Sequence, residues 1–280
     1  MRSNLLIIVC CLLFWQASKS QSLEVGGFFG ISGYSGELQV GQVDLLEIHP
    51  AFGAHLTYRP SRTLAMKFSL MKGKISGDDA NYPTIEFRRN RNLSFRSKVY
   101  EASMLLELNF LNFGTADSPR ASTFLFSGVS GFYFNPQAYY QNQWVDLQPL
   151  GTEGQGIHQV GPGRYNRFQL AIPVGIGFNV FTTEQSSVGL RLGIRKTFTD
   201  YLDDIGSNYP NLEVLQTVNP TAAALSFRGA EVTGDAGVNP SGAKRGNPGN
   251  DVYFFGGVSF SIVISKAKTS VDRLTHKYYY

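Results

Sequence analysis

Residues 167–180, RFQLAIPVGIGFNV, alternate between apolar side chains and side chains that are polar or small. A β-strand directs successive side chains to opposite faces of a sheet, so this segment predicts a strand with one continuous apolar face. It is long enough to cross a bilayer as a tilted strand, which needs about 9–11 residues. The same alternation recurs along the chain, and this repetition indicates a transmembrane β-barrel.

Residues 1–20 have the layout of a secretion signal peptide. Arg2 provides a positive charge, residues 5–15 form an apolar run, and residues 17–20 (ASKS) offer small side chains for cleavage before Gln21. The apolar run is shorter than the ~20 residues that a membrane-spanning helix needs. Both cysteines lie in this run and neither follows the small residue of a lipidation box. The mature chain is therefore expected to contain no disulfide and no thiolate metal site.

Composition excludes some classes of protein. The net charge of +4 is spread along the chain without a compact basic block, so we expect no binding of nucleic acid. The mean hydropathy of −0.12 argues against a helical membrane protein. An aromatic content of 13% and 30 glycines suit a small barrel, in which glycine lets strands curve and aromatic side chains line the membrane interfaces.

The alternation predicts eight strands. One candidate, around residues 96–110, could also be a helix, but its apolar residues recur at every second position and fit a period of two better than 3.6. The expected strands lie near residues 24–36, 51–59, 64–70, 96–110, 123–135, 167–180, 187–199 and 251–265.

The connections alternate between short and long. They are brief around residues 61, 117–119 and 183–185, whereas the others lengthen along the chain to a loop of residues 200–250. This alternation is typical of outer-membrane barrels with short periplasmic turns and long extracellular loops, and a soluble β-sandwich gives no reason for it. We therefore predict an all-β, eight-stranded antiparallel up-and-down transmembrane β-barrel over residues 21–265, located in a Gram-negative outer membrane with both termini in the periplasm.

The interior of an eight-stranded barrel is just wide enough for side chains to fill it. Charged side chains expected there should pair, because an unpaired buried charge is costly. Such a set could form a selectivity ring or a proton path, but we favour an ion-paired plug without a small-molecule substrate. The predicted interior ion network comprises Glu24, Arg59, Lys67, Glu101, Glu107, Arg167, Arg191 and Arg195.

No catalytic, cofactor-binding or metal-binding residue is predicted. The four histidines (His49, His55, His158 and His276) lack metal-ligand spacing. Catalysis by His55 with a nearby serine is conceivable, but this histidine is expected to pack into the polar interior.

Charged loop segments allow several interpretations. The acidic residues 78–79 and 200–204 could bind calcium, but without the spaced ligands of a recognisable loop they are expected to be solvated carboxylates. The basic residues 88–91 could contact anionic lipopolysaccharide or form a solvated loop. Residues 230–250, rich in Gly, Pro and Asn, are expected to be disordered.

Four segments carry a resemblance to a known family. Together FRRNRNLSFRSKVYE (87–101), FYFNPQAYY (132–140), WVDLQPLGTEGQG (144–156) and RKTFTDYLDDI (195–205) resemble the PorG-like outer-membrane barrels of Bacteroidota, over residues 23–264. The resemblance implies a non-enzymatic accessory or anchoring component of type IX protein secretion. It also implies association with the periplasmic ring proteins PorK and PorN. The alternative is a stand-alone small barrel that binds partners at the surface or conducts small solutes.

Residues 266–280 would form a periplasmic C-terminal tail. They are either a frayed basic terminus or a docking peptide in which Tyr278, Tyr279 and Tyr280 act as aromatic anchors. The sequence leaves both interpretations open.

Overall fold

The structure is a computed structural model that describes residues 21–39, 41, 44–114, 119–157, 161–235, 238–247 and 249–266. The expected signal peptide, residues 1–20, and the expected docking residues Tyr278, Tyr279 and Tyr280 lie outside the described residues.

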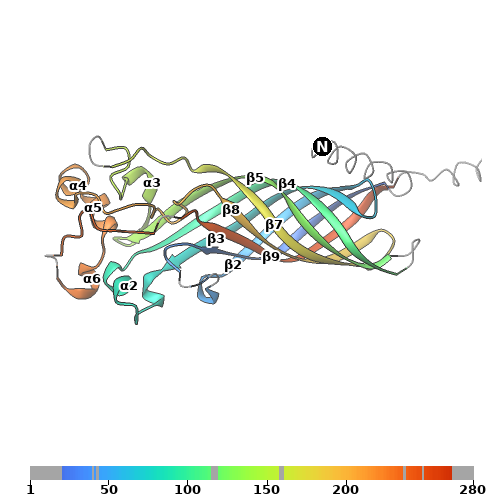
Figure 1. Cartoon of the computed structure of the whole chain (residues 1–280), viewed down its shortest axis with the longest axis horizontal. Coiled ribbons are helices and arrows are strands. Elements are labelled where there is room, and N and C mark those ends of the chain that lie inside the picture. Colours follow the sequence, from blue (N-terminus) through green and yellow to red (C-terminus); the bar gives the residue numbers. More distant parts are fainter. Residues whose placement is uncertain are drawn as a thin grey trace, which may run out of the picture.

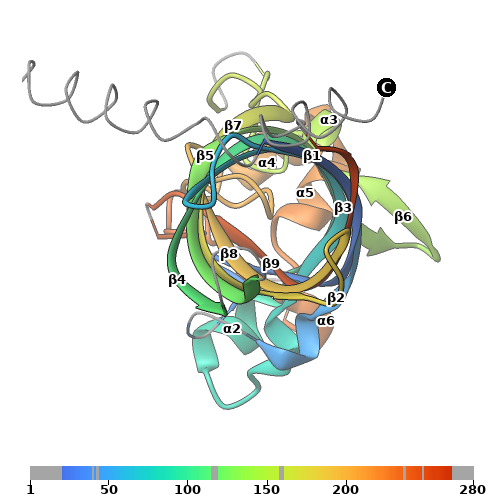
Figure 2. The same cartoon turned by 90° about the vertical axis from the view of Figure 1, so that its right-hand side faces the viewer.

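Eight antiparallel strands form a closed barrel (Figures 1 and 2). Each strand pairs with its neighbour in the chain, and the first pairs with the last, so that Ser22 lies opposite Lys266. Closure leaves no free edge among these strands. The predicted fold is confirmed, and its strands are β1 (Ser22–Ser35), β2 (His49–Arg59), β3 (Leu64–Asp78), β4 (Ser94–Gly114), β5 (Pro119–Tyr140), β7 (Phe168–Phe181), β8 (Ser186–Thr197) and β9 (Val252–Lys266).

Large apolar side chains cover the outer face of the barrel. On β7, Leu170 is 61% exposed and Val174 48%, whereas the inward Ala171 between them is only 2% exposed. An apolar face of this extent is unfavourable in water and is typical of a surface that contacts lipid chains. The alternation read from the sequence therefore separates the lipid-facing side from the interior.

Glycines on β7 make room for aromatic rings inside the barrel. A Cβ added to Gly177 would lie 2.1 Å from Cζ of Phe124 on β5, and one added to Gly175 would lie 2.3 Å from Cζ of Phe126. No side chain fits at these distances. The inner face of β7 therefore carries small residues because aromatic rings from β5 occupy the space next to it.

A ninth strand, β6 (Gln143–Asp146), lies outside the barrel and was not predicted. It pairs with the end of β5 through a hairpin whose turn residues, Gln141 and Asn142, both have positive φ. A two-residue turn of this kind favours Asn-Gly, so Gln-Asn gives a weak sequence signal. The hairpin projects sideways from the barrel wall (Figure 2).

The two ends of the barrel differ (Figure 1). We call one of them the turn end. It contains the first and last described residues and the short connections 60–63 and 182–185. The third short connection, 115–118, lies outside the described residues. At the other end the long connections fold together. We call them the loop cap and define it as the described residues of 36–48, 79–93, 141–167 and 198–251.

The loop cap contains short helices and no long one. None of the helices in the described part of the chain has the length and apolar character needed to span a membrane. The helices are η1 (Leu45–Glu47), η2 (Asp79–Asn81), α2 (Glu86–Arg91), α3 (Leu147–Leu150), α4 (Leu212–Val218), α5 (Pro220–Ser226) and α6 (Ala230–Thr233).

The expectation that residues 230–250 are disordered is wrong for their described part. Tyr209 exchanges backbone hydrogen bonds with this segment, donating to the Ala243 carbonyl at 2.9 Å and accepting from Gly242 N at 2.9 Å. The side chain of Arg245 is buried. Composition suggested disorder because the segment is rich in Gly, Pro and Asn, but backbone pairing and one buried cation order it.

Candidate functional site

One group of inward side chains places a carboxylate between two cations. Glu107 on β4 is fully buried, and its Oε1 lies 2.6 Å from Arg191 Nη2 and 3.2 Å from Lys67 Nζ. The guanidinium carbon of Arg191 also lies 4.7 Å and 4.9 Å from the ring centroids of Phe124 and Phe126. These contacts compensate charges that would be costly to bury alone.

A second group also bridges β4 and β8. Arg195 Nε lies 2.9 Å from Oε2 of Glu101, and Tyr253 Oη donates to the same oxygen at 2.7 Å. The guanidinium carbon of Arg195 lies 4.6 Å from the ring centroid of Phe255. The two groups together fill the interior between opposite walls of the barrel.

The remaining predicted interior residues behave differently from one another. Arg59 Nε and Glu24 Oε1 pair at 2.6 Å between the adjacent strands β1 and β2. Arg167 does not join the interior groups: its side chain is 30% exposed, donates to Asn135 Oδ1 at 2.8 Å and lies 3.9 Å from Asp146. It precedes the first residue of β7 at the mouth of the barrel, where the chain has already left the interior, so placing it in the network was incorrect.

A histidine and a serine meet inside the barrel. His55 Nε2 lies 3.0 Å from Ser261 Oγ, and both side chains are buried. The histidine thus packs into the polar interior, as the sequence predicts. His158 and His276 lie outside the described residues.

A cavity of about 30 Å³ lies between His55, Lys67, Arg191 and the surrounding side chains. It has room for water, since about 10–15 Å³ open to the centre of a water molecule is enough to hold one. The charged and aromatic side chains therefore occupy the interior that a solute would have to cross.

The loop cap has a buried ion pair of its own. Arg245 is 2% exposed, and its Nη1 lies 3.0 Å from Oε1 of the buried Glu153. The same guanidinium donates to the carbonyls of Asp204 at 2.6 Å and Ser226 at 3.1 Å. Glu153 in turn accepts from Ser207 Oγ at 2.6 Å. One side chain thereby connects three loop segments that are distant in sequence.

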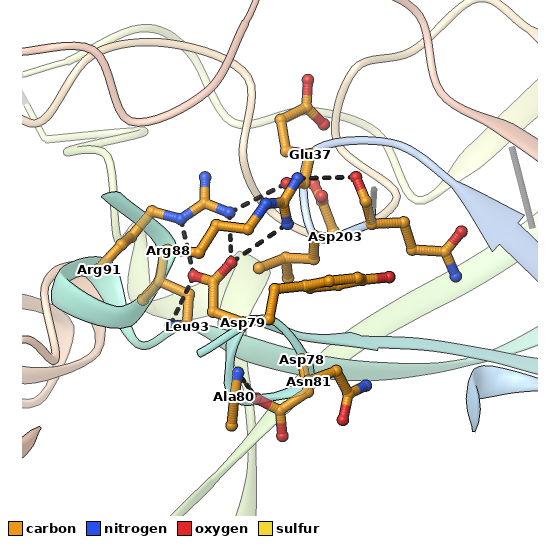
Figure 3. Close-up of polar contacts among 12 residues, drawn as sticks. Glu37, Asp78, Asp79, Ala80, Asn81, Arg88, Arg91, Leu93 and Asp203 are labelled. Atoms are coloured by element: carbon orange, nitrogen blue, oxygen red, sulfur yellow. Dashed lines mark hydrogen bonds and ion pairs between the residues drawn. The ribbon is translucent and has the colours of Figure 1, made fainter. Parts of the chain in front are cut away.

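A second buried pair organises the loop between β3 and β4 (Figure 3). Both carboxylate oxygens of Asp79 accept from Arg91, at 2.8 Å each, and Arg88 Nη1 lies 3.3 Å away. Arg91 also donates to the carbonyls of Glu37 and Arg245. The expectation of a solvated carboxylate is wrong for Asp79, which is buried. Of the basic residues 88–91, for which lipopolysaccharide contact and a solvated loop were both open, Arg91 is buried and only Arg89 of the three arginines is exposed.

The acidic residues 203–204 are also buried rather than solvated. Asp204 accepts from Thr152 Oγ1 and, at 2.7 Å, from Tyr165 Oη, and burial raises the pKa of its carboxyl to about 6. Asp203 accepts from Tyr34 Oη, and burial raises its pKa to about 7. Their hydroxyl partners come from other loops and strands, which is why local sequence suggested exposed carboxylates.

A family model described as a domain of unknown function, DUF6089, matches residues 3–241. The chain belongs to the DUF6089 family. No curated protein matches it.

Solved structures that match the fold include small bacterial barrels. The N-terminal barrel domain of Pseudomonas aeruginosa OprF is 9% identical, with a TM-score of 0.37, and the match covers 87% of this chain and 100% of that one. Neisserial surface protein A is 10% identical, with a TM-score of 0.37 and coverage of 86% and 96%. Ail of Yersinia pestis is 6% identical, with a TM-score of 0.36 and coverage of 88% and 99%. The closed strand pairing and the apolar outer face of this DUF6089 protein are themselves typical of a small outer-membrane barrel.

The outer wall of the DUF6089 barrel carries cations near the loop cap. Lys74 on β3 lies directly opposite Lys98 on β4, and both side chains point outward. Lys72 Nζ lies 5.6 Å from the ring centroid of Tyr100, and the Arg96 guanidinium stacks 3.4 Å from that of Trp144. We call Lys72, Lys74, Arg96 and Lys98 the basic wall patch.

Sequence reasoning missed the residues that organise the loop cap, above all Arg245 and Glu153. It named Asp200 among acidic residues that could bind calcium but did not connect it with Glu37 and Asp251. The ligand atoms of these three carboxylates lie within 4.8 Å of one another. One signal could have located this group. Glu37 and Asp200 directly follow predicted strands and Asp251 begins one, and the three strands are neighbours in a closed barrel.

Proposed function

We propose that this DUF6089 protein is a non-enzymatic outer-membrane barrel that conducts no solutes and acts as a surface-binding protein through its loop cap. The observation that carries the proposal is the filled interior, in which Glu107, Arg191, Glu101 and Arg195 link opposite walls. A narrow channel would need a continuous path past these side chains. The loop cap is then the exposed part that remains for recognition, on the extracellular side, with the turn end in the periplasm.

The loop cap has features of a preorganised binding surface. Its two buried ion pairs hold the loops in one arrangement, which lowers the entropic cost of binding a partner. Next to them, Leu45 and Leu46 on η1 are 80% and 74% exposed, and Phe87 on α2 is 56% exposed. The loops that carry them are joined by Tyr82 Oη, which donates to Asp44 at 2.6 Å. Exposed apolar side chains on a fixed framework suit a protein partner.

Two measurements test this proposal. In planar bilayers the purified protein is expected to give no discrete conductance steps, while a general porin in the same bilayers does. Leu46→Asp is expected to reduce partner recovery from gently solubilised envelopes, whereas Val218→Asp on α4, a residue that is also exposed, preserves it. Porin-like steps would overturn the non-conducting role. Equal recovery with both variants would overturn the binding surface on η1.

We further propose that the basic wall patch binds the phosphates of lipopolysaccharide. Like charges directly opposite each other on paired strands are destabilising, yet Lys74 and Lys98 occupy such positions near the cap end. An anionic headgroup in the outer leaflet would remove this repulsion.

Lipid binding is measurable in reconstituted vesicles. The double variant Lys74→Gln/Lys98→Gln is expected to retain several-fold less lipopolysaccharide than the wild type, and dephosphorylated lipid is expected to bind weakly. Lys196→Gln, an outward lysine on β8, is the matched control. Equal loss with the control variant would refute the patch.

The role in type IX secretion is the second candidate function, and the resemblance of four segments to PorG-like barrels favours it. In this structure those segments contain the framework of the loop cap, including Arg91, Glu153 and Asp204. The protein would anchor the periplasmic ring of PorK and PorN from the membrane. Recovery of both ring proteins in comparable amounts with a tagged form would support this role.

The C-terminal tail provides a separate test of the secretion role. If Tyr278, Tyr279 and Tyr280 dock on a ring protein, truncation after residue 265 should abolish recovery of PorK and PorN. Unchanged recovery and unchanged secretion would eliminate the docking role of the tail while leaving the barrel assignment intact.

A further inference from the structure

Three carboxylates from different connections meet at the cap end of the barrel. Glu37 follows β1, Asp200 follows β8, and Asp251 immediately precedes β9. Since β9 pairs with both β1 and β8, the topology places these three positions side by side. One ligand oxygen from each residue lies within 4.8 Å of the others.

Each of these carboxylates has a buried oxygen that accepts no hydrogen bond from an N–H or hydroxyl donor: Glu37 Oε2, Asp200 Oδ1 and Asp251 Oδ1. The Glu37 and Asp251 side chains lie within hydrogen-bonding range of each other. Asp251 is only 1% exposed, and its other oxygen is held by Leu202 N at 2.8 Å, which fixes the direction of the carboxylate. A buried unsatisfied oxygen is costly, and in a folded protein it indicates an ion or water that completes its contacts.

No protein cation compensates this group. Among the described residues, none of the three carboxylates forms an ion pair, whereas the neighbouring buried acids Asp79 and Glu153 each pair with an arginine. The carboxylates are therefore unfavourable as anions unless a positive charge lies among them.

The donor set suits calcium. Ca²⁺ binds oxygen ligands at about 2.3–2.6 Å, so two of its ligand atoms are separated by at most about 5 Å. The three carboxylate oxygens satisfy this limit. Glu37 and Asp200 are partly exposed, so water can reach the site and fill the remaining positions of a six- to eight-coordinate ion.

We propose that Glu37, Asp200 and Asp251 form a calcium site at the mouth of the barrel. The site holds both ends of the β8–β9 connection against the end of β1. Because this connection carries α4, α5, α6 and Arg245, the ion stabilises the arrangement of the whole loop cap. The site is independent of any partner that the cap binds.

Terbium luminescence tests the site directly. Tb³⁺ occupies calcium sites and emits when a nearby tyrosine is excited. Tyr34 is suitable because its hydroxyl lies close to Asp251. Both groups border the same point: a Cβ added to Gly36 would lie 2.3 Å from Tyr34 Oη and 2.1 Å from Asp251 Oδ1. The EDTA-treated, folded protein in detergent is expected to show saturable luminescence on addition of Tb³⁺, and excess Ca²⁺ should displace it.

Variants identify the ligands. Asp251→Asn and Asp200→Asn are each expected to weaken Tb³⁺ binding at least ~10-fold, because each removes a charged oxygen ligand. Glu213→Gln on the exposed surface of α4 is the matched control and should bind as the wild type does. The shift in gel mobility on heating, measured for every variant, verifies that the barrel is folded.

If a variant fails to fold, Tb³⁺ luminescence of the wild-type protein is sufficient to test the proposal. Absence of saturable luminescence in the folded wild-type protein would overturn it, as would luminescence that excess Ca²⁺ does not displace. Equal binding by Asp251→Asn would also overturn the assignment of the ligands. A site that shares protons instead of an ion would give no luminescence and would be stabilised by the asparagine variants.

Discussion

Arg191 on β8 reaches across the barrel interior to Glu107 on β4, and their Nη2 and Oε1 atoms lie 2.6 Å apart. Two strands, β5 and β7, separate β4 from β8 along one side of the barrel. The contact therefore joins walls that share no backbone hydrogen bonds. It makes the interior a structural element of the barrel, and its energetic weight can be measured.

Removing the shared carboxylate should strongly destabilise the barrel. Glu107→Gln leaves Lys67 and Arg191 without an anionic partner, and loss of one partner from a buried ion pair costs about 3–5 kcal/mol. Urea unfolding in detergent measures this loss. Glu231→Gln, which breaks an exposed pair with Arg228, should cost less than about 1 kcal/mol. Similar effects of the two variants would contradict the structural role of Glu107.

A side chain added at Gly177 should clash with Phe124. We expect Gly177→Val to destabilise the barrel by about 1–3 kcal/mol, since the ring lies where the new Cβ must go. Gly163→Val has open space around its Cβ and serves as the control. Combining Gly177→Val with Phe124→Ala should recover part of the lost stability. If the double variant loses as much stability as the two single variants together, the contact between residue 177 and Phe124 would be contradicted.

Loss of Arg245 should open the loop cap without unfolding the barrel. Arg245→Met leaves the buried Glu153 unpaired and frees two carbonyls, so protease cleavage within residues 206–250 is expected to be at least ~10-fold faster. The heat-induced shift in gel mobility should persist. Arg228→Met is the control, because Glu231, the partner of Arg228, is about half exposed. Unchanged cleavage would contradict the role of Arg245 in ordering the cap.

The pH dependence of cap stability should reflect Asp204. Burial raises the pKa of this carboxyl from the usual 3.8 to about 6, so the folded cap binds its proton more tightly than the unfolded chain does. Its stabilising contribution is complete below pH ~4 and is lost as the pH rises through about 6, with a slope of at most about 1.4 kcal/mol per pH unit. The rate of cap proteolysis, measured in EDTA, should therefore fall between pH 7 and pH 5.

Asp204→Asn should reduce this pH dependence, because the amide has no proton to bind. The remaining slope would come from Asp203, Asp200 and Glu37, whose pKa values are also raised by burial, to about 7, about 6 and about 9. An unchanged slope in the variant, or cap stability that increases with pH, would contradict the assignment to Asp204.

Period-two alternation made the barrel predictable from the sequence. Each wall residue has its orientation set by its parity in the strand, so the apolar positions of β7 and the inward charges at 101, 107, 191 and 195 could be assigned one segment at a time. The prediction failed at the ends of strands, where the alternation of side chains between the two faces stops. Arg167 lies just before β7, and β6 begins after a turn that the sequence marks only weakly.

The sequence by itself therefore determined the eight strands, their lipid-facing sides and the charges that point inward, because these depend on neighbours two residues apart. Only the tertiary structure decided which loop charges are buried and with what partners. Arg245 pairs with Glu153, 92 residues away, and donates to Asp204, 41 residues away. Such pairs form because barrel closure brings the ends of β5, β7, β8 and β9 to one mouth. A pattern of neighbouring residues in the sequence does not contain that proximity.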